Sequence, residues 1–561
     1  MKLIVGIDFG TSTTVVRYRE EGSNVIQAVK ADNGKSEIIP SAIFKPADGG
    51  SSVYGLQALQ LDSSCADGKL YTNFKIDLLD SQKSDEAKAD IIDFLTFVYS
   101  LFEHATKALH PDKMDVYVSY PAKWSDDMVT FMKYAVETAG FKGDGVTVKG
   151  MKEPQAASLN MLNDCQHQLI SSGVLVAGKP LRVFMLDMGA GTSDISIFKL
   201  EIDVKGKTKI SDLLSYPSIS EPVLCGGREI DGLMQKYFID MGKANGVEIM
   251  PEGVDLFSVK NWKETSLSPC LLRENPDTGK NDLRMPSNVT FMLQMTKRMD
   301  LLNKFSIKRK DFERLSNGHW RKLYGLIRSA FKQYAFAKPE DIDIVFLTGG
   351  HSNWYVVPNL FNGKGLIDGM AEIGNDPEAL DFKKIREAPE LRMTDLNSTL
   401  PHESVARGLC LADENVEFEP RSANNVWAKI KIADSESNEM QIVDKNNILP
   451  KVQKISFSKT IMKHVLFEKH AFETCVNIYT GERLCDADSR CYEFNYDGGK
   501  SFWEVLLSIL FVFPFFVKLE YELRVSMEIT MTVEGELRVN GVVDFDNKTV
   551  LTFTEKNLKV V

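Results

Sequence analysis

The commonest nucleotide-binding signatures are missing from this chain. Gly34-Lys35-Ser36 has the tail of a P-loop, but Val29 stands where the first glycine of that loop belongs. No G-x-G-x-x-G segment follows a strand-like run either. These two absences argue against a phosphate held at a helix N-terminus.

Cysteine and positive charge are also scarce. The chain has eight cysteines in 561 residues and a net charge of −11, with no dense basic run. The few scattered thiols fit a reducing cytoplasm, and residues 1–7 begin a strand without a basic leader, so we expect a cytoplasmic protein. The charge argues against nucleic acid as a partner. No C-x₂₋₄-C knuckle is present, so we expect no zinc site at the thiols near His464 and His470, which are Cys475, Cys485 and Cys491.

A hydrophobic run long enough to span a membrane is absent as well. The densest apolar stretch, Trp503–Val517, is too short and is interrupted by Glu504 and Pro514, so we expect no transmembrane segment. A buried core strand or helix is the favoured interpretation of this stretch. The alternative is an exposed surface that binds peptides, a protein partner or a membrane surface.

What the chain does contain is one short device used twice. KLIVGIDFGTSTTVVRY runs into Asp8 and continues through a turn, and LRVFMLDMGAGTSDISIF does the same around Asp187. Each apolar run has the length and the β-branched or aromatic content of a strand, so both copies predict strand, tight turn, strand. Glycine in such a turn lets the backbone approach a ligand and aim successive N–H groups at it, as anion-binding nests do.

The two aspartates, Asp8 and Asp187, imply that a cation is bound with the phosphate. A carboxylate beside a phosphate is repulsive unless a cation lies between them, so the pairing implies bound Mg²⁺. A single D-x-G-T turn is common in ordinary hairpins, whereas two copies in matching context favour phosphate binding. The pattern predicts a nucleoside triphosphate held between two halves of a duplicated fold.

The sequence divides into three segments of different composition. Residues 1–412 alternate strand-like and helix-like stretches, as α/β proteins do, and include expected helices at 125–140 and 309–335. Residues 413–450 are polar and predict a linker, and 451–561 predict a smaller, mainly β domain. We expect 523–534 to be a strand with one buried face, because apolar residues alternate along it. Asn540-Gly541 predicts a two-residue hairpin turn.

Several motifs resemble those of the heat-shock protein 70 (DnaK-type) chaperones, within the actin, hexokinase and heat-shock ATPase superfamily. GIDFGTST and LDMGAGTSDISI resemble the two phosphate loops of that family. Further similar segments follow in family order, and they are YTNFKIDLL (71–79), YPAKWSD (120–126), KEPQAASLN (152–160), CGGREID (225–231), FLTGGHS (346–352) and VARGLCLA (405–412). The resemblance covers residues 1–412 and implies an actin-like ATPase fold with a nucleotide cleft between two lobes.

The resemblance also implies roles for individual residues. Asp8 and Asp187 are implied to hold Mg²⁺, and Lys75 to place a positive charge on the γ-phosphate. Glu153 and Asp194 stand where the family places carboxylates near the attacking water. The phosphate-binding set implied by the motifs is Gly10, Thr11, Ser12, Gly189, Gly191 and Thr192. Gly349, Gly350 and Ser352 are implied to border the nucleoside and Lys263 to face the adenine, and Gly226 and Gly227 also belong to the implied nucleotide-binding set.

The chain departs from the family at places that matter for coupling between domains. Val129 stands where an arginine follows the family's proline switch, and Asn353 where an arginine stacks on adenine. The apolar interdomain linker is replaced by ADENVEFEPRS. We therefore expect a slow, Mg²⁺-dependent ATPase that binds ATP and ADP, and a chaperone that binds polypeptide clients and cochaperones through its β-region. The alternative is an ATP-binding scaffold or partner-binding module, and a small-molecule kinase is disfavoured.

Overall fold

Both turns singled out in the sequence connect antiparallel strands, as predicted. The paired strands are β1 (Lys2–Phe9) with β2 (Thr13–Glu20), and β10 (Leu181–Met188) with β11 (Ser193–Ile202). The two turns close with the same backbone hydrogen bond. The Gly10 amide donates to the Thr13 carbonyl and the Gly189 amide to the Thr192 carbonyl, each over 3.0 Å.

These hairpins are seen in a computed structural model that describes most of the chain. The residues outside the description are 32–33, 64–66, 79, 81, 122–123, 204–206, 217–224, 275–282, 334–337, 363–379, 394–400, 413–415, 420–425, 433–437, 445–446, 465–469, 481–482, 485–489, 497–517, 533–535, 546–547 and 560–561. The chain divides into two compact units. Unit 1 comprises Met1–Lys209 and Leu214–Glu417, and unit 2 comprises Ile210–Leu213 and Phe418–Val561.

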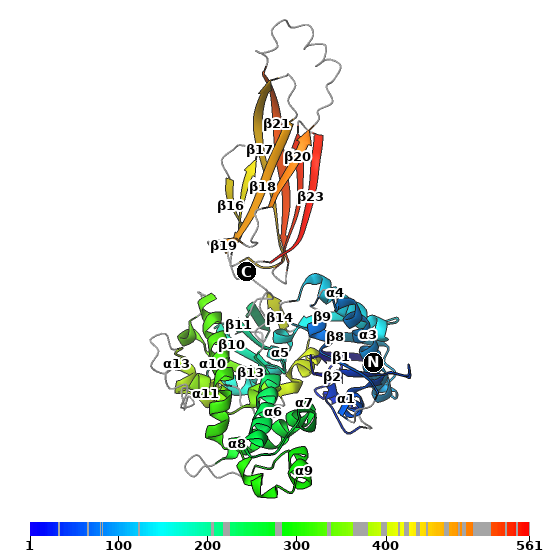
Figure 1. Ribbon diagram of the computed structural model, residues 1–561. Helices are drawn as coiled ribbons and strands as arrows, with labels where there is room; N and C mark the ends of the chain where they lie inside the picture. The colour runs from blue at the N-terminus through cyan, green and yellow to red at the C-terminus, as the bar shows by residue number, and fades with distance from the viewer. Residues whose placement is uncertain are drawn as a thin grey trace. The chain divides into compact units, whose positions relative to one another are not determined.

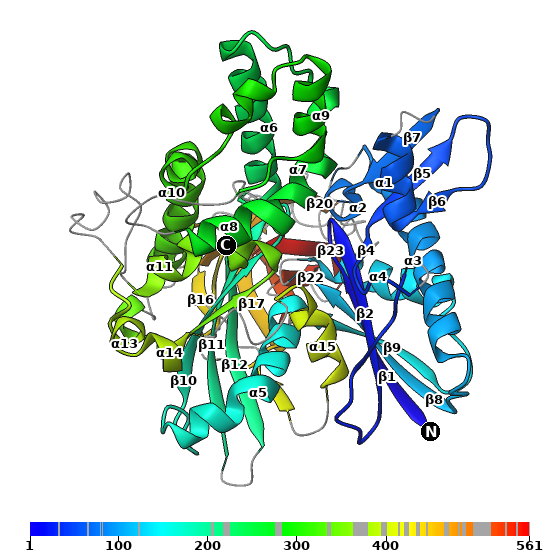
Figure 2. The same cartoon turned by 90° about the horizontal axis from the view of Figure 1, so that it is seen from below.

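Each hairpin belongs to a larger sheet with the same local topology (Figure 2). The additional strands are β3 (Gln27–Ala28), β4 (Ile39–Pro40), β8 (Lys113–Tyr120), β9 (Val146–Lys152), β12 (Thr208–Tyr216), β13 (Ile344–Thr348) and β14 (Val416–Glu419). The first sheet has the order β3-β2-β1-β8-β9, with β4 beside β2, and the second has the order β13-β10-β11-β12-β14. β1 pairs in parallel with β8, and β10 pairs in parallel with β13. Both sheets thus place a later parallel strand beside the first strand of the hairpin.

Helices and a small sheet complete unit 1 (Figure 1). The small sheet contains β5 (Ala42–Pro46), β6 (Val53–Tyr54) and β7 (Gly68–Thr72). The helices up to β10 are α1 (Gly55–Ser63), α2 (Phe74–Asp77), α3 (Ser84–Thr106), α4 (Asp126–Ala139) and α5 (Glu153–Ser171). Those after β12 are α6 (Gly227–Ala244), α7 (Leu256–Trp262), α8 (Ser268–Arg273), α9 (Ser287–Met295), α10 (Arg309–Gln333), α11 (Val356–Asn362), α13 (Lys383–Glu387), α14 (Pro389–Arg392) and α15 (Ser404–Cys410).

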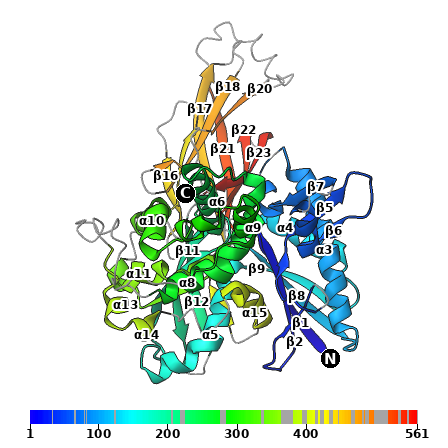
Figure 3. The same cartoon turned by 60° about the horizontal axis from the view of Figure 1, so that its bottom comes forward.

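Shorter helical turns join these elements. The 3₁₀ turns are η1 (Pro251–Val254), η3 (Met299–Lys304), η4 (Pro339–Asp341), η5 (Gly350–Asn353) and η7 (Pro401–Glu403), and η2 (Lys263–Leu267) is a π-helical turn. The turn η1 joins α6 to α7, η2 joins α7 to α8, and η3 follows α9. The helices α6 and α9 lie near each other in Figure 3.

Two helices begin where the sequence predicts. The Ser125 hydroxyl accepts a hydrogen bond from the Met128 amide at the start of α4, and Gly140 ends that helix with φ of 134°. A serine N-cap satisfies one of the amides that a helix leaves unpaired, and glycine tolerates a backbone that other residues rarely adopt. The long amphipathic segment expected at 309–335 forms α10.

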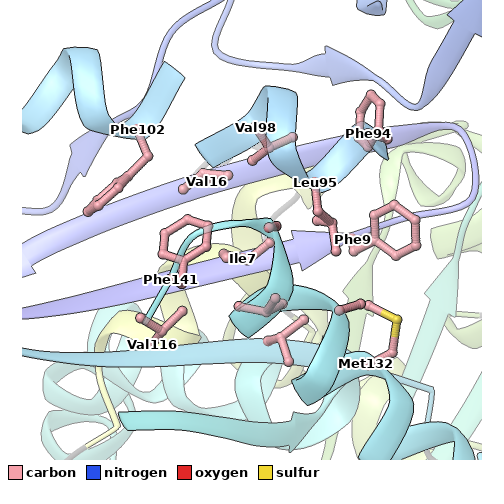
Figure 4. Close-up of a cluster of buried hydrophobic side chains, with 14 of the residues drawn as sticks. Ile7, Phe9, Val16, Phe94, Leu95, Val98, Phe102, Val116, Met132 and Phe141 are labelled. Carbon is pink, nitrogen blue, oxygen red and sulfur yellow. The ribbon is translucent and has the colours of Figure 1, made fainter. Parts of the chain in front are cut away.

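The side chains of β1 alternate between a hydrophobic core and the opposite face of its sheet. Ile7 and Phe9 are fully buried and cluster with Leu95 and Val98 of α3 and Met132 of α4 (Figure 4). Successive side chains of a strand point to opposite faces, so Asp8 lies on the other face. The hydrophobic core therefore holds β1 in place from one face, while the Asp8 carboxylate lies on the other face.

Helix α15 packs on that opposite face. A side chain at Gly6 would lie 2.5 Å from the Ala406 carbonyl oxygen of α15. On α15 itself, a Cβ at Gly408 would lie 1.7 Å from the Ala156 carbonyl oxygen of α5. Figure 2 shows α5 and α15 between the two sheets. Glycine at 408 therefore sets how closely these two helices approach each other.

Unit 2 consists of antiparallel strands in two sheets. The strands are β15 (Val426–Ile432), β16 (Asn438–Val443), β17 (Lys451–His464), β18 (His470–Thr480), β19 (Arg483–Leu484), β20 (Arg490–Tyr496), β21 (Lys518–Met531), β22 (Glu536–Phe545) and β23 (Lys548–Lys559). One sheet has the order β16-β15-β18-β19, with β20 beside β18, and the other has the order β17-β21-β22-β23. The strands β15 and β16 lie in the segment interpreted above as a linker.

The period-2 pattern at the C-terminal end of β21 is confirmed. Val525, Met527, Ile529 and Met531 are buried, while the residues between them are partly exposed. The hairpin turn predicted at 540–541 is wrong, because β22 continues through it and pairs with β21 on one side and β23 on the other. Pairing on both sides and burial of Leu537, Val539 and Val543 outweigh the local turn preference of the Asn-Gly pair.

The apolar stretch Trp503–Val517 lies outside the described residues, so its two interpretations stay predictions. Within the described part of the chain, no helix has the length and the hydrophobicity needed to cross a membrane.

We predict that Gly408→Ala destabilises the protein, because the added methyl group would overlap the Ala156 carbonyl and force α15 away from α5. The expected loss is about 1–3 kcal/mol of unfolding free energy, read as a lower thermal midpoint. Gly318→Ala in α10 is the matched control: that glycine is exposed, and a Cβ there meets nothing within 4 Å. The control is expected to gain about 0.5–1 kcal/mol through helix propensity. Equal midpoints for the two variants would contradict this packing account.

Candidate functional site

The acids predicted from the motifs lie at the ends of strands in unit 1. Asp8 and Asp187 stand near the ends of β1 and β10, and the hairpin register places Asp194 directly opposite Asp187. Glu153 is the first residue of α5, directly after β9. Lys75 lies in the short helix α2.

A buried ion pair connects two of these residues. The Lys75 ammonium lies 2.5 Å from the Glu153 carboxylate, and the lysine is only 7% exposed. The same ammonium stands 5.5 Å from the centroid of the Trp124 ring. Such packing holds the charge of Lys75 in one place, which a solvated surface lysine does not do.

Asp8 and Asp187 are electrostatically strained. Burial, followed by the charge of Glu153, raises the pKa of Asp8 to about 6, although Lys75 and a 2.8 Å hydrogen bond from Ser119 act in the opposite direction. Burial also raises the pKa of Asp187 well above its ordinary value, with further contributions from Glu153, Asp194 and Asp8. The five charged groups therefore form one cluster.

This cluster holds four carboxylates and one ammonium group, so it lacks positive charge. Carboxylate oxygens are the ligands that hard divalent cations prefer, and a cation there would relieve the repulsion that raises both pKa values. The donor set thus fits the Mg²⁺ ion that the paired turns imply.

The start of α6 is bonded directly to the second turn. The Gly227 amide donates to the Gly189 carbonyl over 3.2 Å, and the Arg228 amide donates to the Ala190 carbonyl over 2.8 Å. A Cβ at Gly226 would lie 2.7 Å from the backbone of Ala190. The two glycines of this motif therefore permit the close approach of helix and turn.

Lys263 lies beside the start of α6 rather than among the acids. Its ammonium pairs with Asp231 at 2.8 Å and donates to the Gly227 carbonyl over 3.1 Å. Both charged side chains are buried. The structure therefore brings together Lys263 and Gly227, two residues of the implied nucleotide-binding set.

The loop at 349–352 packs against the end of β10. Gly349 has φ of 79°, and a Cβ there would lie 2.6 Å from a carboxylate oxygen of Asp187. The Ser352 hydroxyl donates to the Gly349 carbonyl over 2.7 Å, and Gly350 begins the turn η5. The predicted nucleoside loop is thus next to the acid cluster.

A chain of buried polar groups supports this loop. The Trp354 indole donates to His351 Nδ1 over 3.1 Å, and His351 Nε2 lies 2.9 Å from His319 Nε2. His319 Nδ1 in turn lies 2.7 Å from the Glu229 carboxylate. An indole can only donate, so a neutral His351 carries its proton on Nε2 and a neutral His319 carries its proton on Nδ1.

Burial lowers the pKa of His319 and lowers that of His351 further, which agrees with two neutral rings. Cys225 lies near His319 and Glu229, and these three side chains have the composition of a metal site. The protonated Nδ1 of His319 is not free to bind a metal in this arrangement. The cluster is therefore a satisfied hydrogen-bond chain that holds η5 to α10 and α6.

Two side chains join the site although the sequence analysis gave them no role. Ser119 at the end of β8 donates to Asp8, and Arg228 of α6 donates to the Ser12 hydroxyl over 2.7 Å. Ser12 lies in the first turn with Gly10 and Thr11. On the second turn, the Thr192 hydroxyl lies 3.5 Å from Asp194. Neither Ser119 nor Arg228 has a spacing signal in the sequence, because both contacts join residues more than a hundred positions apart.

Comparison with known proteins agrees with the motifs. The family model described as Hsp70 protein matches residues 95–361. The chaperone protein DnaK of Mycoplasma mobile is 23% identical over 62% of this chain and 51% of its own length. The DnaK of Elusimicrobium minutum is 22% identical over 64% of this chain and 53% of its own length. The DnaK of Endomicrobium trichonymphae is 24% identical over 47% of this chain and 39% of its own length.

The chain is therefore similar to the Hsp70 family over residues 95–361, and it is divergent from the DnaK proteins it matches. An actin-like ATPase fold goes with this family, and the mixed α/β sheets of unit 1 agree with it. The matches span about half or less of the length of these DnaK proteins.

We predict that Asp8→Asn stabilises the metal-free protein. Asparagine keeps the acceptor for Ser119 and removes a buried charge whose pKa is raised to about 6. A raised folded pKa means that the native state holds its proton while the unfolded state loses it, so wild-type stability falls between about pH 4 and pH 6. The advantage of the variant should grow over that interval and level off at about 1–3 kcal/mol by pH 7.

Thermal midpoints measured in chelator from pH 4 to pH 8 check this expectation. Asp144→Asn is the control, because that aspartate is exposed and the substitution removes the same charge. A pH-independent difference between Asp8→Asn and wild type would show that Asp8 does not titrate as described.

Proposed function

We propose that unit 1 binds ATP with Mg²⁺ and hydrolyses it, with the nucleotide held in a cleft between two lobes of a duplicated actin-like fold. One observation carries this proposal: four carboxylates and one lysine form a single cluster at the ends of two glycine-containing hairpins. An acid cluster of this kind beside two anion-binding turns is the arrangement that a metal–polyphosphate complex requires.

Asp8 and Asp187 are the residues that would hold the metal, through its water ligands. When bound, Mg²⁺ neutralises negative charge on the phosphates. The phosphates themselves would be held by turn amides and hydroxyls, which belong to Gly10, Thr11, Ser12, Gly189, Gly191 and Thr192. The nucleoside would lie against Gly226, Gly227, Lys263, Gly349, Gly350 and Ser352.

Three charged side chains would carry out the hydrolysis of ATP. Lys75 supplies a fixed ammonium group that stabilises charge on the γ-phosphate as it departs. Glu153, which pairs with Lys75, and Asp194, which neighbours Asp187, orient the attacking water and accept its proton. The buried position of the Lys75–Glu153 pair supports these roles, because both groups are held before substrate arrives.

We predict that Asp187→Asn abolishes ATP hydrolysis while the protein stays folded. The substitution removes a charge that anchors the metal, and the pKa of Asp187, raised by burial, indicates that the metal-free fold does not need that charge. Phosphate release in single-turnover experiments measures the effect, with the thermal midpoint as a check on folding. Hydrolysis at the wild-type rate would remove Asp187 from the site.

We predict that Lys75→Met lowers the turnover number about 10²–10³-fold, with a much smaller change in nucleotide affinity. The physical reason is that a fixed charge acts most strongly on the charge that develops during reaction. Lys83→Met is the matched control. Lys83 is exposed, and it forms an ion pair with Asp77, which lies in α2 together with Lys75. Weak ATP binding with normal turnover at saturation would assign Lys75 to ground-state binding instead.

For the remainder of the chain we propose polypeptide binding through the β-region. We propose 1–412 as the nucleotide-binding domain and 451–561 as part of the substrate- or partner-binding domain, to which β15 and β16 of the segment 413–450 also belong. The support is the name of the relatives, which are chaperones, together with the two antiparallel sheets of unit 2. We also propose that the protein works with cochaperones and is located in the cytoplasm.

An ATP-binding scaffold without a chaperone cycle is the alternative. It is favoured by Val129 and by the polar segment after residue 412, which replace the switch and the linker of the family. Steady-state ATP turnover with and without unfolded polypeptide separates the two functions. A change in rate on addition of polypeptide supports the chaperone, and an unchanged rate together with no polypeptide binding supports the scaffold.

A further inference from the structure

Arg228 connects two segments that are distant in sequence and adjacent to the acid cluster. From the second position of α6, it donates through Nη2 to the Ser12 hydroxyl over 2.7 Å and through Nη1 to the Asn73 side-chain oxygen. Ser12 belongs to the first turn, and Asn73 directly precedes α2, which carries Lys75. The guanidinium group therefore lies where the first turn, the lysine segment and the second turn converge.

Arg228 forms no ion pair with a carboxylate among the described residues, although the charge of Asp231 acts on it. Both of its hydrogen-bond acceptors are neutral, and no described carboxylate forms an ion pair with it. Arg17, by contrast, is fully buried and pairs with Glu403 at 2.8 Å. Burial lowers the pKa of Arg228, and the nearby charge of Asp231 only partly opposes this shift.

Helix stability does not account for this arginine. Anions are favoured in the first turn of a helix and cations are disfavoured, because the helix dipole is positive at its N-terminus. The amides of Gly227 and Arg228 are already bonded to the second turn, so the helix needs no capping group from the side chain. Glu229 of the same turn is bonded to His319 and not to Arg228, so the guanidinium group is left to an anion supplied from outside the chain.

We propose that Arg228 binds the terminal phosphate of a nucleoside triphosphate and exchanges its bonds to Ser12 and Asn73 for that anion. The inference rests on the proposed function of unit 1 and adds a residue that none of the motif roles assigns. A guanidinium group offers two parallel donors to a phosphate, and both terminal nitrogens already point at the first turn and the α2 segment. Because only a triphosphate has this terminal phosphate, Arg228 would favour the binding of a nucleoside triphosphate over a diphosphate.

The test compares ATP and ADP affinities of Arg228→Gln, Arg228→Lys and wild type by calorimetric titration in Mg²⁺. Arg228→Gln is expected to weaken ATP binding about tenfold or more, and ADP binding by much less. Arg228→Lys should retain part of the preference, since it keeps the charge and loses the paired donors. Arg314→Gln on α10 is the matched control, because that arginine is 80% exposed.

A second variant separates binding from structural support. Asn73 adopts a left-handed backbone with φ of 68°, which glycine tolerates, so Asn73→Gly removes an acceptor without strain. The proposal predicts that Asn73→Gly keeps its preference for ATP. Equal losses of ATP and ADP affinity in Arg228→Gln, with a lower thermal midpoint in Arg228→Gln and in Asn73→Gly, would show that Arg228 only stabilises the fold. That result would overturn the proposal.

Inorganic tripolyphosphate distinguishes failure of this inference from failure of the proposed function. A wild-type protein that binds neither ATP nor ADP contradicts the nucleotide function. Tripolyphosphate binding that is lost in Arg228→Gln and kept in Arg314→Gln would still support the anion site. Absence of both kinds of binding overturns the assignment of Arg228 as well.

Discussion

The site of unit 1 is organised around a shortage of positive charge. Asp8, Glu153, Asp187 and Asp194 lie in a largely buried place, and among the described residues Lys75 is the cation whose charge acts on Asp8 and Asp187. Buried carboxylates without enough partners are costly, and strain of that kind is retained where a ligand relieves it. The hydrophobic core beneath β1 and the packing of α15 on α5 hold the strands that carry this cluster in place.

The two hairpins supply the same geometry twice, and the elements around them differ. At the second turn, the amides of Gly227 and Arg228 bond the loop carbonyls, so that α6 is fixed to the turn. Behind it, the chain from Trp354 through His351 and His319 ties the 349–352 loop to α6 and α10. The first turn is joined to this frame by the side chain of Arg228. The second turn is thus held by several hydrogen bonds, and among the described residues the side chain of Arg228 joins this frame to the first turn.

Local signals predicted much of this structure. Both hairpins, the Ser125 and Gly140 ends of α4, and the alternation along β21 follow from patterns within a few residues. The turn predicted at 540–541 was wrong because pairing on two sides of a strand is a tertiary effect that a dipeptide does not reveal. Ser119 and Arg228 were missed for a related reason, since their partners lie far away in sequence. Lys263 was placed near the nucleoside by resemblance, and its ion pair with Asp231 was not foreseen.

The account depends most directly on whether the acid cluster binds a metal together with a nucleotide. Titration of ATP into the wild-type protein at pH 8, in chelator and at increasing Mg²⁺ concentration, measures this. We predict that ATP binds weakly in chelator, where the four carboxylates repel the phosphates, and that affinity rises with Mg²⁺ until one metal accompanies each nucleotide. ATP binding of equal strength with and without Mg²⁺, or none in either condition, would contradict the account.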